Sequence, residues 1–130
     1  QEKLVRMYTC GPTVYNYVHI GNLRTFTFQD ILRRWLRARG YELRHVMNIT
    51  DVEDKIIRDA ARSGKSIFEF TAVYTQAFFE DTQRIRIERP EQVVKATDHI
   101  PEMVADIQAL EAKGHTYTSD GSVYYRIASF

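Results

Sequence analysis

The sequence predicts an α/β fold in which helices flank a parallel sheet. Residues 4–9 and 41–49 are apolar or alternating runs of strand length, and residues 20–39 have the apolar spacing of a helix. Two strands joined through one helix are expected to be parallel, with a right-handed crossover. The Gly- and Pro-containing segment 10–22 leads from the first strand into the helix, as in nucleotide-binding α/β folds that hold phosphates at a helix N-terminus.

The first predicted helix is amphipathic and ends before Gly40, a good C-terminal cap. Its apolar stripe is predicted to contain Phe26, Ile31, Leu32, Trp35 and Leu36, with Arg33, Arg34, Arg37 and Arg39 outside it. We expect these arginines to form a solvated face.

Two more helices are predicted after the second strand. Thr50 or Asp51 can cap a helix over residues 52–63, and Ser66 can cap a helix over residues 67–84. The apolar face of the latter is predicted to contain Ile67, Phe70, Tyr74 and Phe78.

The remaining part of the chain is less regular. Residues 86–97 are predicted to be a loop, residues 100–113 a helix, and residues 116–127 a hairpin that turns at a Ser-Asp-Gly sequence. We therefore expect residues 1–85 to form an α/β unit and residues 86–130 to start an inserted subdomain.

Composition bounds the class of protein. The 130 residues are 44% hydrophobic, with 18 basic and 17 acidic side chains, so a buried core is expected and net charge gives no signal for nucleic acid. A single cysteine excludes an internal disulfide and suits a reducing compartment. No apolar run approaches the roughly 20 residues that span a bilayer. The chain starts at Gln1 and stops at Phe130 within a strand-like run, so we expect a fragment of a larger protein with exposed apolar edges.

Two segments are expected to form one site. Ligands of parallel sheets bind beyond the carboxyl ends of the strands. Segments 10–22 and 48–55 follow the first two strands, so the fold would bring them together. Cys10 ends the first strand, a position that suits a ligand better than core packing.

These segments resemble a known family. Residues 19–22 (His-Ile-Gly-Asn) are similar to the HIGH motif of class I aminoacyl-tRNA synthetases. Residues 10–15 (Cys-Gly-Pro-Thr-Val-Tyr) and 48–57 (Asn-Ile-Thr-Asp-Val-Glu-Asp-Lys-Ile-Ile) resemble the cysteinyl-tRNA synthetase family in particular. Residues 96–103 and 121–127 are also similar to that family, so the resemblance covers nearly the whole chain.

The resemblance implies a fold and a chemistry. The fold would be a Rossmann-like (HUP-type) parallel sheet with flanking helices, followed by the start of a connecting-peptide insertion. The family is a cytoplasmic ligase that activates L-cysteine with ATP, supplied with magnesium, to cysteinyl-adenylate. It then transfers the cysteinyl group to tRNA(Cys). A zinc ion binds the substrate thiolate, and the other zinc ligands and the KMSKS loop lie beyond residue 130, so the isolated chain is expected to be inactive.

The resemblance also assigns residue roles. It makes Cys10 a zinc ligand, and a zinc thiolate separates cysteine from serine better than pocket shape does. It makes His19 and Asn22 the catalytic residues that donate hydrogen bonds to ATP phosphates. Its ATP-binding set is Pro12, Thr13, His19, Gly21 and Asn22. Its substrate-cysteine set is Cys10, Gly11, Thr13 and Thr50. Asn22 replaces the usual histidine of the motif, keeping a donor without a charge.

Each assignment has a structural alternative. A lone Cys10 is often a small buried hydrophobe, and His19 or Asn22 can serve only to cap the helix. Thr13 can bond its own backbone in the turn, and Thr50 can cap the next helix. Tyr15 and Tyr17 are expected either to line the pocket or to pack in the core.

Other charged residues are expected to be structural. Asp51, Glu53 and Asp54 are interpreted as exposed first-turn acids that complement a helix dipole rather than as a magnesium site. The arginines of the first helix, and separately Arg84, Arg86 and Arg89, have tRNA phosphates as the alternative to solvent. His45, His99 and His115 lack ligand-like spacing.

Two other functions compete with this one. One is the related ligase that joins cysteine to an amino sugar in mycothiol synthesis, which shares zinc and adenylate chemistry but needs no tRNA. The other is a non-catalytic nucleotide-binding module. The oligomeric state does not follow from the sequence.

Overall fold

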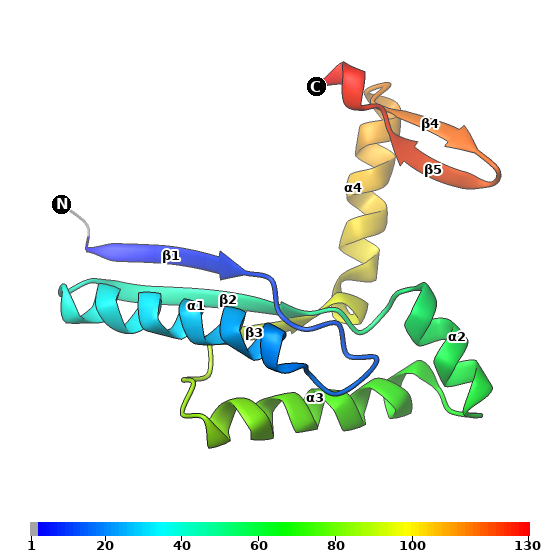
Figure 1. The fold of residues 1–130 in the computed structure, drawn as a ribbon. Coiled ribbons are helices and arrows are strands. Elements are labelled where there is room, and N and C mark those ends of the chain that lie inside the picture. The colour runs from blue at the N-terminus through cyan, green and yellow to red at the C-terminus, as the bar shows by residue number, and fades with distance from the viewer. Residues whose placement is uncertain (1–2) are drawn as a thin grey trace. The chain divides into compact units, whose positions relative to one another are not determined.

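The computed structural model describes residues 3–130 (Figure 1). It divides into two compact units, one extending to Asp98 and the other comprising His99–Phe130. The domain division at residue 86 stays a prediction. No helix among the described residues is long and apolar enough to cross a membrane.

A three-stranded parallel sheet organises the first unit, in the order β1-β2-β3. Its strands are β1 (Leu4–Thr9), β2 (Glu42–Ile49) and β3 (Gln92–Lys95). Thr9 is in register with Met47, and Ile49 with Lys95. The predicted parallel α/β fold is therefore confirmed.

The third strand corrects the prediction of a loop over residues 86–97. β3 is only four residues long, and only Val93 and Val94 in it are apolar. So short a run has no recognisable period, and it forms a strand because β2 offers a free parallel edge.

Three helices accompany the sheet: α1 (Ile20–Ala38), α2 (Asp54–Arg62) and α3 (Ile67–Arg84). The predicted cap of α3 is confirmed, because the Ser66 hydroxyl accepts the Glu69 N–H while the Glu69 carboxylate accepts the Ser66 N–H. The core of the unit contains Val14, Phe26, Met47, Ile49 and Phe78.

Within that core, the rings of Phe26 and Phe78 meet edge to face, 4.9 Å between centroids. This contact joins α1 to α3, and Met47 and Ile49 of β2 lie in the same core.

The predicted apolar stripe of α1 is largely wrong. The buried residues of this helix are Phe26, Asp30 and Arg33, whereas Ile31 and Trp35 are 60% and 57% exposed. The reason is a tertiary contact with the segment before β3, which carries carboxylates and free carbonyls rather than apolar side chains.

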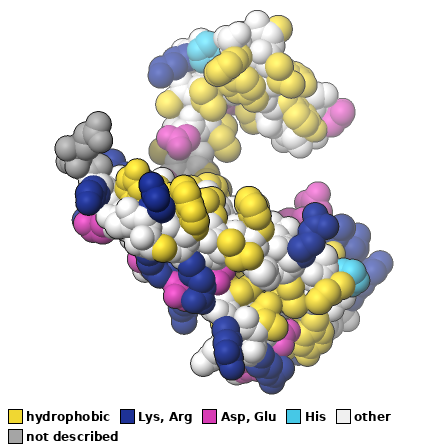
Figure 2. Space-filling model, turned by 60° about the vertical axis from the view of Figure 1, so that its left-hand side comes forward, with side chains coloured by type: hydrophobic (Ala, Val, Ile, Leu, Met, Phe, Trp, Pro, Cys, Tyr) yellow, Lys and Arg dark blue, Asp and Glu magenta, His cyan; other side chains and the backbone are white. Residues whose placement is uncertain are grey.

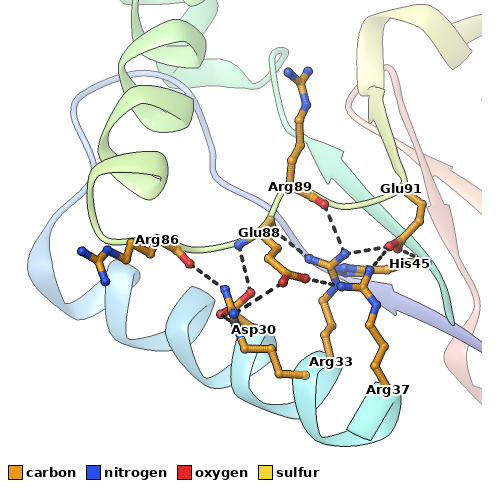
Figure 3. A network of polar contacts seen from close by, with 9 residues as sticks. Asp30, Arg33, Arg37, His45, Arg86, Glu88, Arg89 and Glu91 are labelled. Atoms are coloured by element: carbon orange, nitrogen blue, oxygen red, sulfur yellow. Dashed lines mark hydrogen bonds and ion pairs between the residues drawn. The ribbon is translucent and has the colours of Figure 1, made fainter. Parts of the chain in front are cut away.

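That contact is a network of polar side chains (Figure 3). Arg33 is 1% exposed and donates to the carbonyls of Glu88 and Arg89 at 2.7 and 3.1 Å. It also pairs with Glu91 at 2.9 Å, and Arg37 pairs with both Glu88 and Glu91. Both arginines hold the segment before β3 against α1. The solvated face predicted for the arginines is wrong for Arg33, which is buried, whereas Arg37 remains exposed.

Asp30 anchors the same segment from a second side. Its carboxylate accepts the Glu88 N–H at 2.9 Å and the Arg34 guanidinium at 2.6 Å. Arg34 in turn donates to the Arg86 carbonyl at 2.8 Å. Arg86 itself has a positive φ of 61°, a turn conformation that these bonds hold in place.

The second unit is a helix followed by a hairpin: α4 (Ile100–Ala112), β4 (Thr116–Ser119) and β5 (Ser122–Tyr125). Asp120 and Gly121 both have positive φ, as a two-residue hairpin turn requires. The predicted hairpin is confirmed.

Hydrophobic side chains lie exposed on each of the two units (Figure 2). On α4, Met103, Val104 and Ile107 are 43–46% exposed. In the first unit, Phe28 of α1 is 67% exposed. These side chains lie on helices, and the exposed apolar edges expected for the sheet stay a prediction.

Candidate functional site

The two predicted site segments meet at the carboxyl ends of β1 and β2. Beyond β1, the chain continues alongside β2: the Val14 N–H donates to the Thr50 carbonyl at 3.1 Å, and the Thr50 N–H donates to the Pro12 carbonyl at 3.0 Å. Thr13 and Thr50 thereby form a parallel bridge. The convergence predicted from the order of the elements is confirmed.

Gly11 lies directly against the backbone of β2. A Cβ at this position would stand 1.9 Å from the Asn48 carbonyl oxygen and 2.8 Å from Met47 Cγ. Only glycine fits this approach. The Gly11 N–H also donates to the Asn48 side-chain oxygen at 3.1 Å. Close packing and this hydrogen bond therefore both hold the turn after Cys10 against β2.

Cys10 is exposed, with a free thiol, so its alternative as a buried hydrophobe is wrong. Its carbonyl lies 3.5 Å from the Gln29 amide nitrogen of α1. Residues 3–130 contain no group of three or more His, Cys, Asp or Glu side chains able to hold a metal ion. Within the described residues Cys10 is therefore not part of a metal-binding group of that size.

A cleft of about 290 Å³ opens beside this turn. Its lining comes from the segment after β1 and from the first turns of α1. The lining residues are Gly11, Pro12, Thr13, Tyr15, Asn16, Tyr17, Val18, Asn22 and Phe26. The predicted ATP- and cysteine-binding residues that line it are Gly11, Pro12, Thr13 and Asn22, whereas Cys10, His19, Gly21 and Thr50 lie outside its lining.

The start of α1 is a reciprocal cap formed by the two predicted catalytic residues. His19 Nδ1 accepts the Gly21 N–H at 3.1 Å, and Asn22 Oδ1 accepts the His19 N–H at 3.1 Å. Because Nδ1 accepts, the ring proton of neutral His19 is on Nε2. Because Asn22 uses its oxygen, its NH₂ group remains to donate. The cap and a phosphate contact are therefore compatible.

Tyr15 and Tyr17 line the cleft and are 39% and 63% exposed, so neither is a core residue. The Lys55 ammonium lies 5.1 Å from the Tyr15 ring, and the Tyr17 ring meets Tyr74 of α3 edge to face at 5.3 Å. These contacts join the cleft wall to α2 and α3.

The residues after β2 differ from their predicted roles. The N-cap of α2 is Glu53, so neither Thr50 nor Asp51 caps it. Asp51 is 1% exposed, and its carboxylate accepts the N–H and hydroxyl of Thr97 at 3.0 and 2.6 Å. It joins the end of β2 to the chain after β3, which an exposed first-turn acid would not do.

His45 is a structural residue, as expected, and lies beneath the site. It is 1% exposed, and its Nε2 lies 2.7 Å from the Thr9 hydroxyl, next to Cys10. Burial, reinforced by the charge of Arg33, lowers the pKa of His45. Burial on its own raises the pKa of Glu91, but the His45 N–H and Arg33 reverse this and lower it below its usual value.

The residue that sequence reasoning missed is Asn48. It is half-buried in β2, where its amide bonds three groups of the site. In the sequence, Asn48 is marked by its position, because it is an amide residue within a predicted strand between the apolar residues Met47 and Ile49. In the structure both of these neighbours are buried.

Comparison with known proteins places these observations in a family. Residues 1–130 match the family described as "tRNA synthetases class I (C) catalytic domain". The chain is 59% identical over 129 residues to a cysteine–tRNA ligase of Solibacter usitatus, covering 99% of the chain and 28% of that protein. It is 57% identical over 131 residues to that of Koribacter versatilis (100% and 26%) and 54% identical over 134 residues to that of Treponema denticola (95% and 27%).

The chain spans about a quarter of the length of these relatives. Its parallel sheet and its cleft at the strand ends agree with a class I catalytic domain of Rossmann-like type. The chain belongs to the family of class I tRNA synthetase (C) catalytic domains.

Proposed function

We propose that this chain is the N-terminal part of a cysteine–tRNA ligase. In this reaction the cysteine carboxylate attacks the α-phosphate of ATP, giving cysteinyl-adenylate and pyrophosphate. The cysteinyl group then passes to the 3′ end of tRNA(Cys). The observation that carries the proposal is that Thr13, which bridges to Thr50, and Asn22 at the N-terminus of α1 line one cleft beside the turn that follows Cys10.

The start of α1 would bind the ATP phosphates. The Nε2–H of His19 and the NH₂ of Asn22 are the two side-chain donors that the cap leaves available. They add to the positive end of the helix dipole, and such donors act most strongly where negative charge grows in the transition state.

We propose two roles for Gly21 in this arrangement. A Cβ on it would lie 3.3 Å from His19 Nδ1, so glycine leaves the cap undisturbed. It also leaves room for the nucleotide to approach the backbone. Pro12 and Thr13, in the turn after β1, would also line the ATP site.

Cys10 would bind the substrate cysteine through zinc, with Gly11, Thr13 and Thr50 around the amino acid. The exposed thiol fits one soft ligand position, and the family resemblance implies that the other ligands lie beyond residue 130. When bound, zinc supplies a strong preference for a thiolate over a hydroxyl. We infer a cytoplasmic location, where a lone thiol stays reduced.

Cysteine-dependent ATP–pyrophosphate exchange with zinc present tests the proposal. In the full-length protein, Cys10→Ala should lose both bound zinc and exchange, whereas Arg6→Ala, an exposed change on the same strand, should lose neither. Normal zinc content and exchange in Cys10→Ala would contradict the role of Cys10.

Two further arms define the reaction. The 130-residue chain alone should show no exchange, and exchange above background would contradict the need for the rest of the protein. Charging of tRNA(Cys) by the full-length protein supports a tRNA ligase. Transfer of cysteine to an amino sugar instead would support the mycothiol-type ligase.

A further inference from the structure

Asn48 joins three separate parts of the site through one side chain. Its Oδ1 accepts the Tyr8 hydroxyl at 3.0 Å and the Gly11 N–H at 3.1 Å. Its Nδ2 donates to the Thr50 hydroxyl oxygen at 3.0 Å. One amide in β2 therefore contacts β1, the turn after Cys10 and the residue that follows β2.

The chemistry of these partners fixes the orientation of the amide. A backbone N–H can only donate, so the Asn48 atom facing Gly11 must be the oxygen. The NH₂ group then faces Thr50, whose hydroxyl oxygen must accept from it. The proton of the Thr50 hydroxyl consequently points away from Asn48.

We propose that Asn48 is a positioning residue that presents the Thr50 hydroxyl to the bound amino acid as a hydrogen-bond donor. An oxygen of the amino acid carboxylate is the acceptor that such a donor fits. The same amide fixes the Cys10–Gly11 turn, so the thiol and the Thr50 donor keep one relative position. This inference rests on the proposed cysteine activation.

Asn48→Asp isolates the direction of the Thr50 proton. The introduced carboxylate keeps both acceptor bonds, to Tyr8 and Gly11, but it cannot donate, so Thr50 must turn its proton toward it. In the full-length protein with zinc, we expect the KM for cysteine in pyrophosphate exchange to rise about tenfold, the usual effect of one hydrogen bond to a charged group. The KM for ATP should stay within about twofold.

A double-mutant cycle separates this effect from charge repulsion. Thr50→Val removes the hydroxyl, so adding Asn48→Asp to it should change the KM for cysteine little further. Tyr8→Phe is the matched control, because it removes one bond to Asn48 and leaves Gly11 and Thr50 bonded. Thr50→Ser keeps the hydroxyl and should retain a KM near that of the wild type.

The outcomes are distinct. An equal rise in KM from Asn48→Asp with Thr50 and with Thr50→Val would overturn the inference, because the added charge would then act without the hydroxyl. If Asn48→Asp does not fold, equal cysteine KM values for Thr50→Val and Thr50→Ser would overturn it. Wild-type protein without cysteine-dependent exchange would instead overturn the proposed function.

Discussion

Replacing Gly11 by alanine tests the close contact on which the site geometry depends. The added Cβ would lie 1.9 Å from the Asn48 carbonyl oxygen, whereas ordinary contact begins at 3.4 Å. The turn at Gly11 and the backbone of β2 would therefore have to separate by about 1.5 Å. The atoms that the Cβ would meet are the Asn48 carbonyl oxygen and Met47 Cγ, and neither is the far end of a flexible side chain.

The expected cost follows from what that separation breaks. Overpacking of a well-packed site costs about 1–3 kcal/mol, and the bond from the Gly11 N–H to Asn48 adds about 1 kcal/mol when it is lost. We expect Gly11→Ala to lower the free energy of unfolding by about 2–4 kcal/mol, a large part of the stability of a typical domain.

Urea denaturation followed by circular dichroism measures this loss. Gly64→Ala is the control, because Gly64 has a φ of +66° and no atom within 4 Å of an added Cβ. Its cost is conformational only, about 1–2 kcal/mol. A loss in Gly11→Ala no larger than that in Gly64→Ala would refute the close approach of the turn to β2.

Three other changes test other parts of the structure. Arg33→Met should lower the free energy of unfolding by about 2–6 kcal/mol because it leaves the carbonyls of Glu88 and Arg89 without their donor, at about 1–3 kcal/mol for each unsatisfied group. Arg44→Ala, whose ion pair at 3.9 Å is exposed, should cost less than about 0.5 kcal/mol in the same urea titration. The pKa of His45 is lowered from its usual 6.5 by burial and the charge of Arg33, so the unfolded chain binds its proton first and stability should fall as pH drops through 6.5 toward the lower pKa of the folded state. His45→Gln should flatten that pH dependence of the urea midpoint, and an unchanged slope would contradict a buried neutral imidazole. Asn22→His keeps a ring nitrogen to accept the cap bond and should not weaken ATP binding in a calorimetric titration, whereas a large loss would show that the amide makes a specific contact.

The sequence predicted what local patterns control. The helix over residues 20–39, the cap at Ser66 and the turn at Asp120 and Gly121 depend on neighbours in the chain, and the structure has all three. The convergence of Cys10 with Thr50 also followed, because parallel topology alone brings strand ends together.

The parts that were wrong depend on distant partners. Arg33 is buried because its guanidinium bonds a carbonyl 55 residues away, and no periodicity in α1 carries that information. Asp51 is buried for the same reason, since its partner Thr97 lies 46 residues further on. Arg33 joins α1 to the segment before β3, and Asp51 joins the end of β2 to the segment after β3. Failing to predict the burial of these two residues and failing to predict β3 therefore have the same cause.

The structural and functional interpretations of the site residues are complementary. His19 accepts a cap hydrogen bond at one ring nitrogen, and the N–H of its other ring nitrogen remains available. Asn22 accepts with its side-chain oxygen, and its NH₂ group remains available to donate. The Thr50 hydroxyl oxygen accepts a hydrogen bond from Asn48, and its own proton remains available to donate. In each case the internal bond consumes an acceptor and leaves a donor. The site segments therefore carry donors that the fold itself holds in place, which suits a ligand whose reacting groups are a phosphate and a carboxylate.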